Sequence, residues 1–246
     1  MDKEWLDIFF SHSELRPNRT GHSACPAGPP TFGGRYNYND ENDSITQNLG
    51  LGWLYYSLTR IYQPQDCICI GSGRGFAPIL FAKGIKDNGT GMLRFIDPSL
   101  DDDFWKNCEK VHQWFNTLGI DDVIKHYLMT TEEFSKTEDY HKLKNIDLVY
   151  IDGSHFYEYV KFDFNIFINK ISEKGIILFH DSISRSLNPV WHGPRKAIKE
   201  IIDLGDFQAF DLKFGAGLTL LQKVSKIQTL DYIEWCADQN KGSTNF

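Results

Sequence analysis

A short run in the first third of the chain alternates three glycines with two polar residues, in the order Gly71, Ser72, Gly73, Arg74 and Gly75. Glycine adopts backbone conformations that other residues avoid, and it lets a ligand approach the main chain closely. The run follows the strand-like segment 67–70 and precedes the helix-like segment 76–83. A glycine-rich turn in this position is typical of cofactor sites in open α/β sheets, so the run is the first candidate binding site.

An acidic residue, Asp97, ends the next strand-like segment, 93–96. A carboxylate at about this spacing contacts the ribose hydroxyls in nucleotide-binding α/β folds. A dinucleotide fingerprint also needs a small residue three positions after its second glycine, and Phe76 holds that position. The pattern therefore favours a nucleoside cofactor and argues against a dinucleotide.

A second group of reactive side chains follows two other strand-like segments. Asp152 and His155 come after segment 146–151, and His180 and Asp181 come after segment 176–179. The carboxyl ends of the strands line the active crevice of an open parallel sheet, so these four side chains should converge near the cofactor. Two carboxylates and two imidazoles can bind a divalent ion, or supply a general base beside an anion.

The elements that must position these groups alternate between strand-like and helix-like patterns from about residue 64 to 223. A helix over 101–116 begins with three aspartates at its positive end, and 123–129 is a strand. A short helix starts at Thr130. Segments 207–214 and 217–223 close the pattern as two further strands.

Outside this core, residues 1–62 are expected to form an N-terminal cap or substrate segment with a lead-in helix. Within it, residues 11–43 are rich in proline, glycine, asparagine and arginine, and are expected to be an ordered cap. Residues 63–224 then make up one core domain, and residues 225–246 a C-terminal tail.

Composition narrows the class of protein. The chain has 246 residues, 41% of them hydrophobic and 24% charged, as in ordinary globular proteins. The formal net charge of −7, without runs of lysine or arginine, argues against nucleic acid or membrane surfaces as partners. No stretch reads as a signal peptide or a membrane span, and five cysteines without a scaffold pattern fit a reducing cytoplasm.

The glycine run resembles motif I of the class I S-adenosylmethionine-dependent methyltransferases. The sequence Ile-Asp-Gly-Ser-His over 151–155, with His-Asp at 180–181, is similar to a branch that methylates hydroxyls of sugars and other small natural products. Some members of that branch bind magnesium. The resemblance covers about residues 64–223. It implies a Rossmann-like α/β sandwich with a mostly parallel seven-stranded sheet and an antiparallel last strand.

The resemblance also implies roles for individual residues. S-adenosylmethionine would lie across Gly71–Gly75, with Asp97 on its ribose hydroxyls and Asp152 beside it. Its adenine would lie between the start of the 101–116 helix and Met129–Thr131, in contact with Pro98, Ser99, Thr130 and Thr131. The acceptor would be a small molecule that bears a hydroxyl group, and a homo-oligomer is left open.

At the reacting hydroxyl, His155 is the candidate base, and Asp152 and Asp181 join it as candidate catalytic residues. Asp152, Asp181 and His180 are candidate ligands of Mg²⁺. Metal-using relatives carry an acid where this chain has His180, so metal-free catalysis by His155 is the alternative. Many relatives also carry an acid where this chain has Cys69, a departure that bears on cofactor affinity.

Two other functions stay open at this point. An NAD-dependent oxidoreductase could use a similar sheet, and the Tyr-x-x-x-Lys spacing of some such enzymes occurs at Tyr157 and Lys161, although inside a predicted helix. Phe76 argues against that reading. A non-catalytic partner that keeps the methyltransferase fold is the second alternative, and retention of Asp97, Asp152 and Asp181 argues against it.

Overall fold

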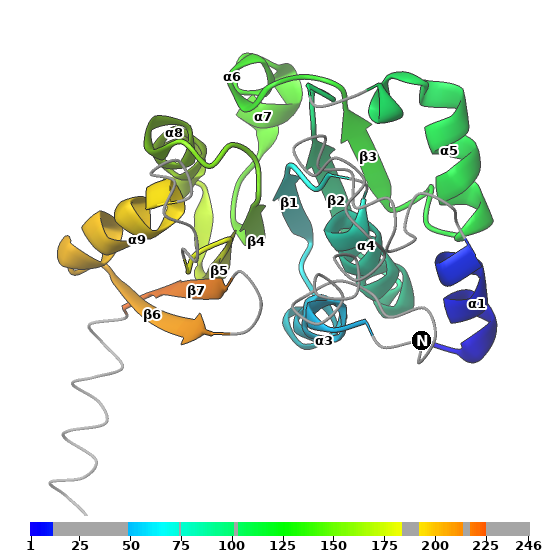
Figure 1. The fold of residues 1–246 in the computed structure, drawn as a ribbon, viewed down its shortest axis with the longest axis horizontal. Helices are drawn as coiled ribbons and strands as arrows, with labels where there is room; N and C mark the ends of the chain where they lie inside the picture. Colours follow the sequence, from blue (N-terminus) through cyan, green and yellow to red (C-terminus); the bar gives the residue numbers. More distant parts are fainter. Residues whose placement is uncertain (12–48, 74, 101–102, 184–191, 214–216, 225–246) are drawn as a thin grey trace, which may run out of the picture.

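The computed structural model describes residues 1–11, 49–73, 75–100, 103–183, 192–213 and 217–224 (Figure 1). The cap predicted over 11–43 lies outside these residues except for Ser11, and so do the tail over 225–246 and Arg74 of the predicted cofactor-binding run. The division of the chain into cap, core and tail therefore stays a prediction. In the part of the chain that is described, no helix has the length and apolar character needed to cross a bilayer.

The described residues form one seven-stranded sheet with the strand order β3-β2-β1-β4-β5-β7-β6. Neighbouring strands from β3 to β5 run parallel, and β7 runs antiparallel to both β5 and β6. This confirms the predicted Rossmann-like sandwich with an antiparallel last strand. The strands are β1 (Asp66–Ile70), β2 (Met92–Ile96), β3 (Ile124–Tyr127), β4 (Ile146–Ile151), β5 (Ile171–His180), β6 (Phe207–Leu212) and β7 (Leu218–Lys223).

Helices cover both faces of the sheet (Figure 1). One face packs against α1 (Lys3–Ser11), α3 (Leu51–Tyr62), α4 (Phe76–Asn88) and α5 (Cys108–Thr117). The other packs against α6 (Thr131–Phe134), α7 (Glu138–Lys142), α8 (Tyr157–Ile168) and α9 (Gly193–Asp203). Because both faces are buried, the central strands consist of nearly continuous apolar runs, as parallel strands do.

The helix predicted over 101–116 is wrong in its extent. A short 3₁₀ helix, η3 (Phe104–Lys106), is followed by a break and then by α5. Asn107 causes the break, because its side chain accepts a hydrogen bond from the Lys110 amide and caps α5. By contrast, the short helix expected at Thr130 is confirmed. The Thr130 and Glu133 side chains form a capping box at the start of α6.

Helix α1 was not predicted from the sequence. It buries Trp5, Leu6, Phe9 and Phe10, and the Trp5 indole donates a hydrogen bond of 2.9 Å to the carbonyl of Leu118 after α5. The first residues of the chain therefore belong to one of the two cores that flank the sheet.

The glycine turn depends on an unusually close contact between two strand ends. Gly71 has a φ of +67°, and a Cβ atom placed on it would lie 2.2 Å from the carbonyl oxygen of Asp152. Gly73 also has a positive φ, +57°, but a Cβ atom there would have no described neighbour within 4 Å. Both residues favour glycine for their backbone conformation, and Gly71 also excludes a side chain sterically.

These two glycines give a matched pair of variants. Gly73→Ala should lower the free energy of unfolding by about 1–2 kcal/mol, the cost of a left-handed conformation for alanine. Gly71→Ala should lower it by about 3 kcal/mol or more, because the backbone of Asp152 must also move. Denaturant unfolding of both variants measures the difference, and equal losses would contradict the close contact.

Candidate active site

The strand register brings the predicted site residues to one edge of the sheet. Ile70 of β1 pairs with Ile96 of β2 and with Ile151 of β4. The residues that follow these three, Gly71, Asp97 and Asp152, therefore lie side by side at the carboxyl ends of adjacent strands. Ile151 also pairs with Phe179 of β5, which brings His180 to the same level.

Asp97 is held rigidly beside the glycine turn. One carboxylate oxygen accepts a hydrogen bond of 2.8 Å from the amide of Ser99, and the Asp97 amide donates to the carbonyl of Tyr127. The side chain is 9% exposed, so it opens only narrowly to solvent. Pro98 and Ser99 follow it directly, and Ser99 has a φ of +56°. This fixed carboxylate could accept hydrogen bonds from a pair of hydroxyl groups.

Trp105 joins the glycine turn to the segment after β2, although sequence reasoning missed it. Its indole nitrogen donates a hydrogen bond of 2.8 Å to the carbonyl of Gly73, and its amide donates to the hydroxyl of Ser99 at 3.0 Å. The ring is 1% exposed, and a Cβ atom on Gly75 would lie 2.8 Å from it. The only sequence signal was a large aromatic residue soon after Asp97.

The side chain of Ser72 lies in the same turn. Its hydroxyl oxygen is buried and has no hydrogen-bond partner among the described residues. A buried hydroxyl without a partner is costly, and a bound ligand would remove that cost. Ser72 is therefore placed as a binding residue should be, next to the open space at Gly73.

The four predicted reactive side chains do come together. His155 Nε2 lies 2.5 Å from Asp181 Oδ2, and His180 Nδ1 lies 3.0 Å from Asp152 Oδ1. His180 Nδ1 is also 3.4 Å from Asp181 Oδ2, so one imidazole lies between both carboxylates. All four side chains are between 16% and 19% exposed. They form a compact cluster that is partly exposed.

The charges of the cluster act strongly on one another. Burial alone would lower the pKa of His180, but the charges of Asp152 and Asp181 outweigh it and raise that pKa well above 6.5. Burial would likewise lower the pKa of His155, yet the hydrogen bond and charge of Asp181 give a net increase. The nearby imidazoles hold the pKa of Asp181 well below its usual range. The cluster thus favours an ionised Asp181 beside protonated imidazoles.

The same cluster contains a set of metal ligands. Potential ligand atoms of Asp152, His155 and Asp181 all lie within 4.8 Å of one another. Two carboxylates with one imidazole suit a hard or borderline divalent ion. His180 was also predicted as a ligand, but its ring nitrogen already contacts both carboxylates, and it is absent from this set.

Asp163 is a buried carboxyl group that the sequence analysis did not identify. It lies on α8, is 5% exposed, and shares a hydrogen bond with the side chain of Thr131 at the start of α6. A Cβ atom on Gly153 would lie 3.5 Å from its carboxylate oxygen. Burial raises the pKa of Asp163 to about 7. This residue joins the segments after β3 and β4, where Thr130 and Thr131 were expected to contact adenine.

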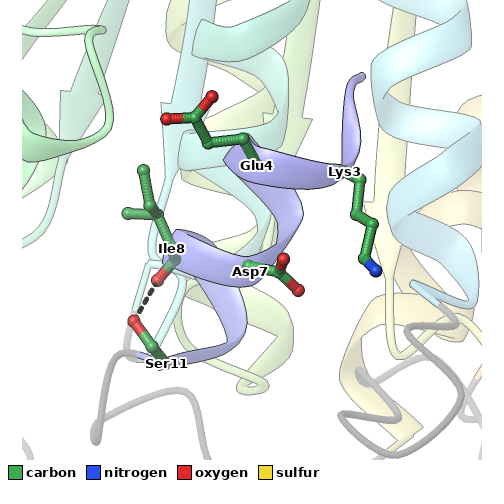
Figure 2. A pocket seen from close by; sticks show the side chains of 5 residues that line it. All are labelled: Lys3, Glu4, Asp7, Ile8 and Ser11. Atoms are coloured by element: carbon green, nitrogen blue, oxygen red, sulfur yellow. Dashed lines mark hydrogen bonds between the residues drawn. The ribbon is translucent and has the colours of Figure 1, made fainter.

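A hollow elsewhere on the surface lies on α1, lined by Lys3, Glu4, Asp7, Ile8 and Ser11 (Figure 2). None of these residues belongs to the strand ends that carry the reactive groups. The candidate active site is therefore the group of side chains at the carboxyl edge of the sheet.

Comparison with known proteins agrees with this fold. Residues 68–182 match a protein-family model described as "Methyltransferase domain". The matched range begins in β1 and includes the glycine turn and all four clustered residues. A Sinorhizobium fredii (strain NBRC 101917 / NGR234) protein, "Uncharacterized protein y4gI", is 42% identical over 138 residues. That match covers 53% of this chain but only 14% of the relative's length.

Two solved structures show the same fold. The O-methyltransferase TomG from Streptomyces achromogenes, solved with S-adenosylmethionine, is 15% identical with a TM-score of 0.59, covering 72% of this chain and 81% of TomG. An O-methyltransferase from Bacillus cereus, solved with S-adenosylhomocysteine, is 16% identical with a TM-score of 0.58, covering 77% of this chain and 86% of its own.

The buried Asp163 carboxyl predicts a stability that depends on pH. Its pKa in the folded protein, about 7, lies above its ordinary value of 3.8, so the folded state keeps the proton to a higher pH. The resulting stability is present at low pH and is lost as pH rises from about 4 to 7.

Asp163→Asn should remove this dependence. Between pH 5 and pH 8 the wild type should lose about 3 kcal/mol of unfolding free energy that the variant keeps. Denaturant unfolding at both pH values measures the difference, with Asp103→Asn, at an exposed carboxylate, as the control. The same pH profile in Asp163→Asn and the wild type would contradict a buried acid.

Proposed function

We propose that this chain transfers a methyl group from S-adenosylmethionine to a hydroxyl oxygen of a small polar acceptor. The match of residues 68–182 to a methyltransferase-domain model, and the fold shared with TomG, support the proposal. One observation carries the proposal. The glycine turn, the Asp97 carboxylate and the Asp–His cluster lie side by side at one edge of the sheet. A methyl donor and a base for the acceptor would then be neighbours.

The described residues fit S-adenosylmethionine. The open space at Gly73, the buried hydroxyl of Ser72 and the fixed carboxylate of Asp97 provide close backbone approach and polar partners. The adenine would lie beside Pro98, Ser99, Thr130 and Thr131. TomG and the Bacillus cereus enzyme, which share the fold, were solved with this cofactor or its demethylated product. Phe76 still argues against a dinucleotide, so the oxidoreductase is not preferred.

The reaction is a direct displacement. The acceptor oxygen forms a bond to the methyl carbon as the bond between that carbon and sulfur breaks, which yields a methyl ether and S-adenosylhomocysteine. The acceptor's proton passes to His155. Because a neutral hydroxyl is a poor nucleophile, this proton transfer is the main chemical task of the protein, together with alignment.

His155 must be neutral to accept that proton. Since Asp181 raises the pKa of His155, its imidazole stays protonated to a higher pH than a free histidine would. The neutral imidazole, which is the form that accepts the proton, is therefore populated only at a higher pH, although it is then the stronger base. Through its 2.5 Å contact with His155, Asp181 sets the pKa of the proposed base.

A divalent ion fits the same donor set. Asp152 and Asp181 would hold it, and a bound Mg²⁺ would supply positive charge that lowers the pKa of the acceptor hydroxyl. His180 would have to share the two carboxylates with the ion. Metal-free catalysis by His155 is the competing mechanism.

The proposed acceptor is a sugar or another small natural product. The Streptomyces achromogenes enzyme with the same fold is described as involved in tomaymycin synthesis, which supports acceptors of this kind. The proposed compartment is the cytoplasm. Cys67, Cys69 and Cys108 are free thiols in the described part of the chain, as a reducing compartment allows.

Asp97→Ala tests the cofactor site. Loss of two charge-assisted hydrogen bonds to the ribose should weaken S-adenosylhomocysteine binding by about 1–3 kcal/mol. Isothermal titration calorimetry measures the loss, with Asp122→Ala, a surface carboxylate paired with Lys86, as the control. Tight NADH binding without S-adenosylhomocysteine binding would contradict the assignment.

Removal of metal tests the second part of the proposal. With an acceptor found by screening, EDTA should abolish methyl transfer and added Mg²⁺ should restore it. Asp181→Ala should lose the response to Mg²⁺, because it removes one of the two carboxylates. Full activity in EDTA, together with full activity of Asp181→Ala, would rule out the ion and leave His155 as the sole catalyst of proton transfer.

A further inference from the structure

A series of two buried hydroxyl groups leads from α3, within the core on one face of the sheet, to Asp152. The Tyr150 hydroxyl on β4 lies 3.1 Å from Asp152 Oδ2, and the Tyr55 hydroxyl on α3 lies 3.3 Å from that of Tyr150. Both tyrosines are 1% exposed. The methyltransferase reaction proposed above does not use either of them.

The direction of these hydrogen bonds follows from the chemistry of the groups. A carboxylate only accepts hydrogen bonds, so the single hydroxyl proton of Tyr150 points to Asp152. Tyr150 can then only accept at its oxygen from Tyr55. The hydroxyl proton of Tyr55 therefore points to Tyr150, and that of Tyr150 points to Asp152.

The rings are fixed by the surrounding core. Tyr55 packs against Tyr150 and Phe81, with ring centroids 5.3 and 5.1 Å away. The two helices α3 and α4 approach closely, because a Cβ atom on Gly52 would lie 2.4 Å from the side chain of Leu80. A rigid aromatic core of this kind holds the two hydroxyl groups in one geometry.

Asp152 is thus fixed on both carboxylate oxygens. Oδ2 accepts from Tyr150, and Oδ1 contacts His180 at 3.0 Å. We propose that Tyr150, supported by Tyr55, is a positioning residue that orients the Asp152 carboxylate toward His180 and the reacting groups. This inference rests on the proposed function, in which Asp152 serves the methyl transfer.

The test compares three Tyr→Phe variants, each of which removes one hydroxyl. Tyr150→Phe and Tyr55→Phe each remove one hydroxyl of the series that leads to Asp152. Tyr127→Phe is the matched control, because the Tyr127 hydroxyl donates to Asp139 and not to Asp152. Thermal unfolding checks that each variant is folded. The readout is the imidazole N–H resonance of His180 in protein labelled with ¹⁵N-histidine, identified by its loss in His180→Gln.

Tyr150→Phe should shift this resonance or broaden it beyond detection, because Asp152 becomes free to rotate. Tyr55→Phe should produce a smaller shift, and Tyr127→Phe none. An unchanged resonance in folded Tyr150→Phe would overturn the inference.

Binding of Mn²⁺, measured by electron paramagnetic resonance, gives a second readout. Tyr150→Phe should bind Mn²⁺ about tenfold more weakly than Tyr127→Phe, as for other residues that orient a ligand. Equal affinities would contradict the positioning role. If the wild type binds no Mn²⁺, the metal in the proposed function is contradicted, and the His180 resonance alone decides the role of Tyr150.

Binding of S-adenosylhomocysteine tests the proposed cofactor separately. Its affinity should stay within about twofold in all variants.

Discussion

The contact between the backbones of Gly71 and Asp152 is the constraint on which the rest of the site depends. The Asp152 amide donates to the carbonyl of Ile70, and its own carbonyl lies where a side chain on Gly71 would be. This contact holds the ends of β1 and β4 together, so that the glycine turn and the Asp152 carboxylate lie at one edge of the sheet. A larger residue at position 71 would separate the methyl donor from the proposed catalytic groups.

From this contact the site extends in two directions. Toward the core, Tyr150 and Tyr55 fix one oxygen of Asp152. In the other direction, His180 contacts both Asp152 and Asp181. Asp181 in turn contacts His155. Two carboxylates that lie this close would repel each other without the imidazoles between them. The imidazoles therefore offset negative charge within the cluster.

Much of this arrangement could be predicted from the sequence, because it follows from the order of strands and turns. The glycine run, Asp97 and the acids after β4 and β5 all occupy strand ends, and parallel strands bring their carboxyl ends to one edge. The strands themselves were recognisable as short apolar runs. Whether the predicted residues bind a cofactor or a metal stays a prediction.

The rest could not be predicted, since it depends on contacts between residues distant in the chain. Trp105 binds the glycine turn across 32 residues, and the Tyr55–Tyr150 contact spans 95. No local pattern distinguishes these aromatic residues from ordinary core residues. Asp163 was overlooked for a similar reason, because an acid within an amphipathic helix is usually exposed. Asn107 split a predicted helix through a local cap that apolar spacing does not reveal.

A crystal structure of the protein with S-adenosylhomocysteine tests the central claim most directly. The account predicts that the ligand lies across Gly71–Gly75, with both ribose hydroxyls on the Asp97 carboxylate. Its sulfur should face the cluster of Asp152, His155, His180 and Asp181. A ligand bound at another place, or a ribose out of hydrogen-bonding reach of Asp97, would contradict the account.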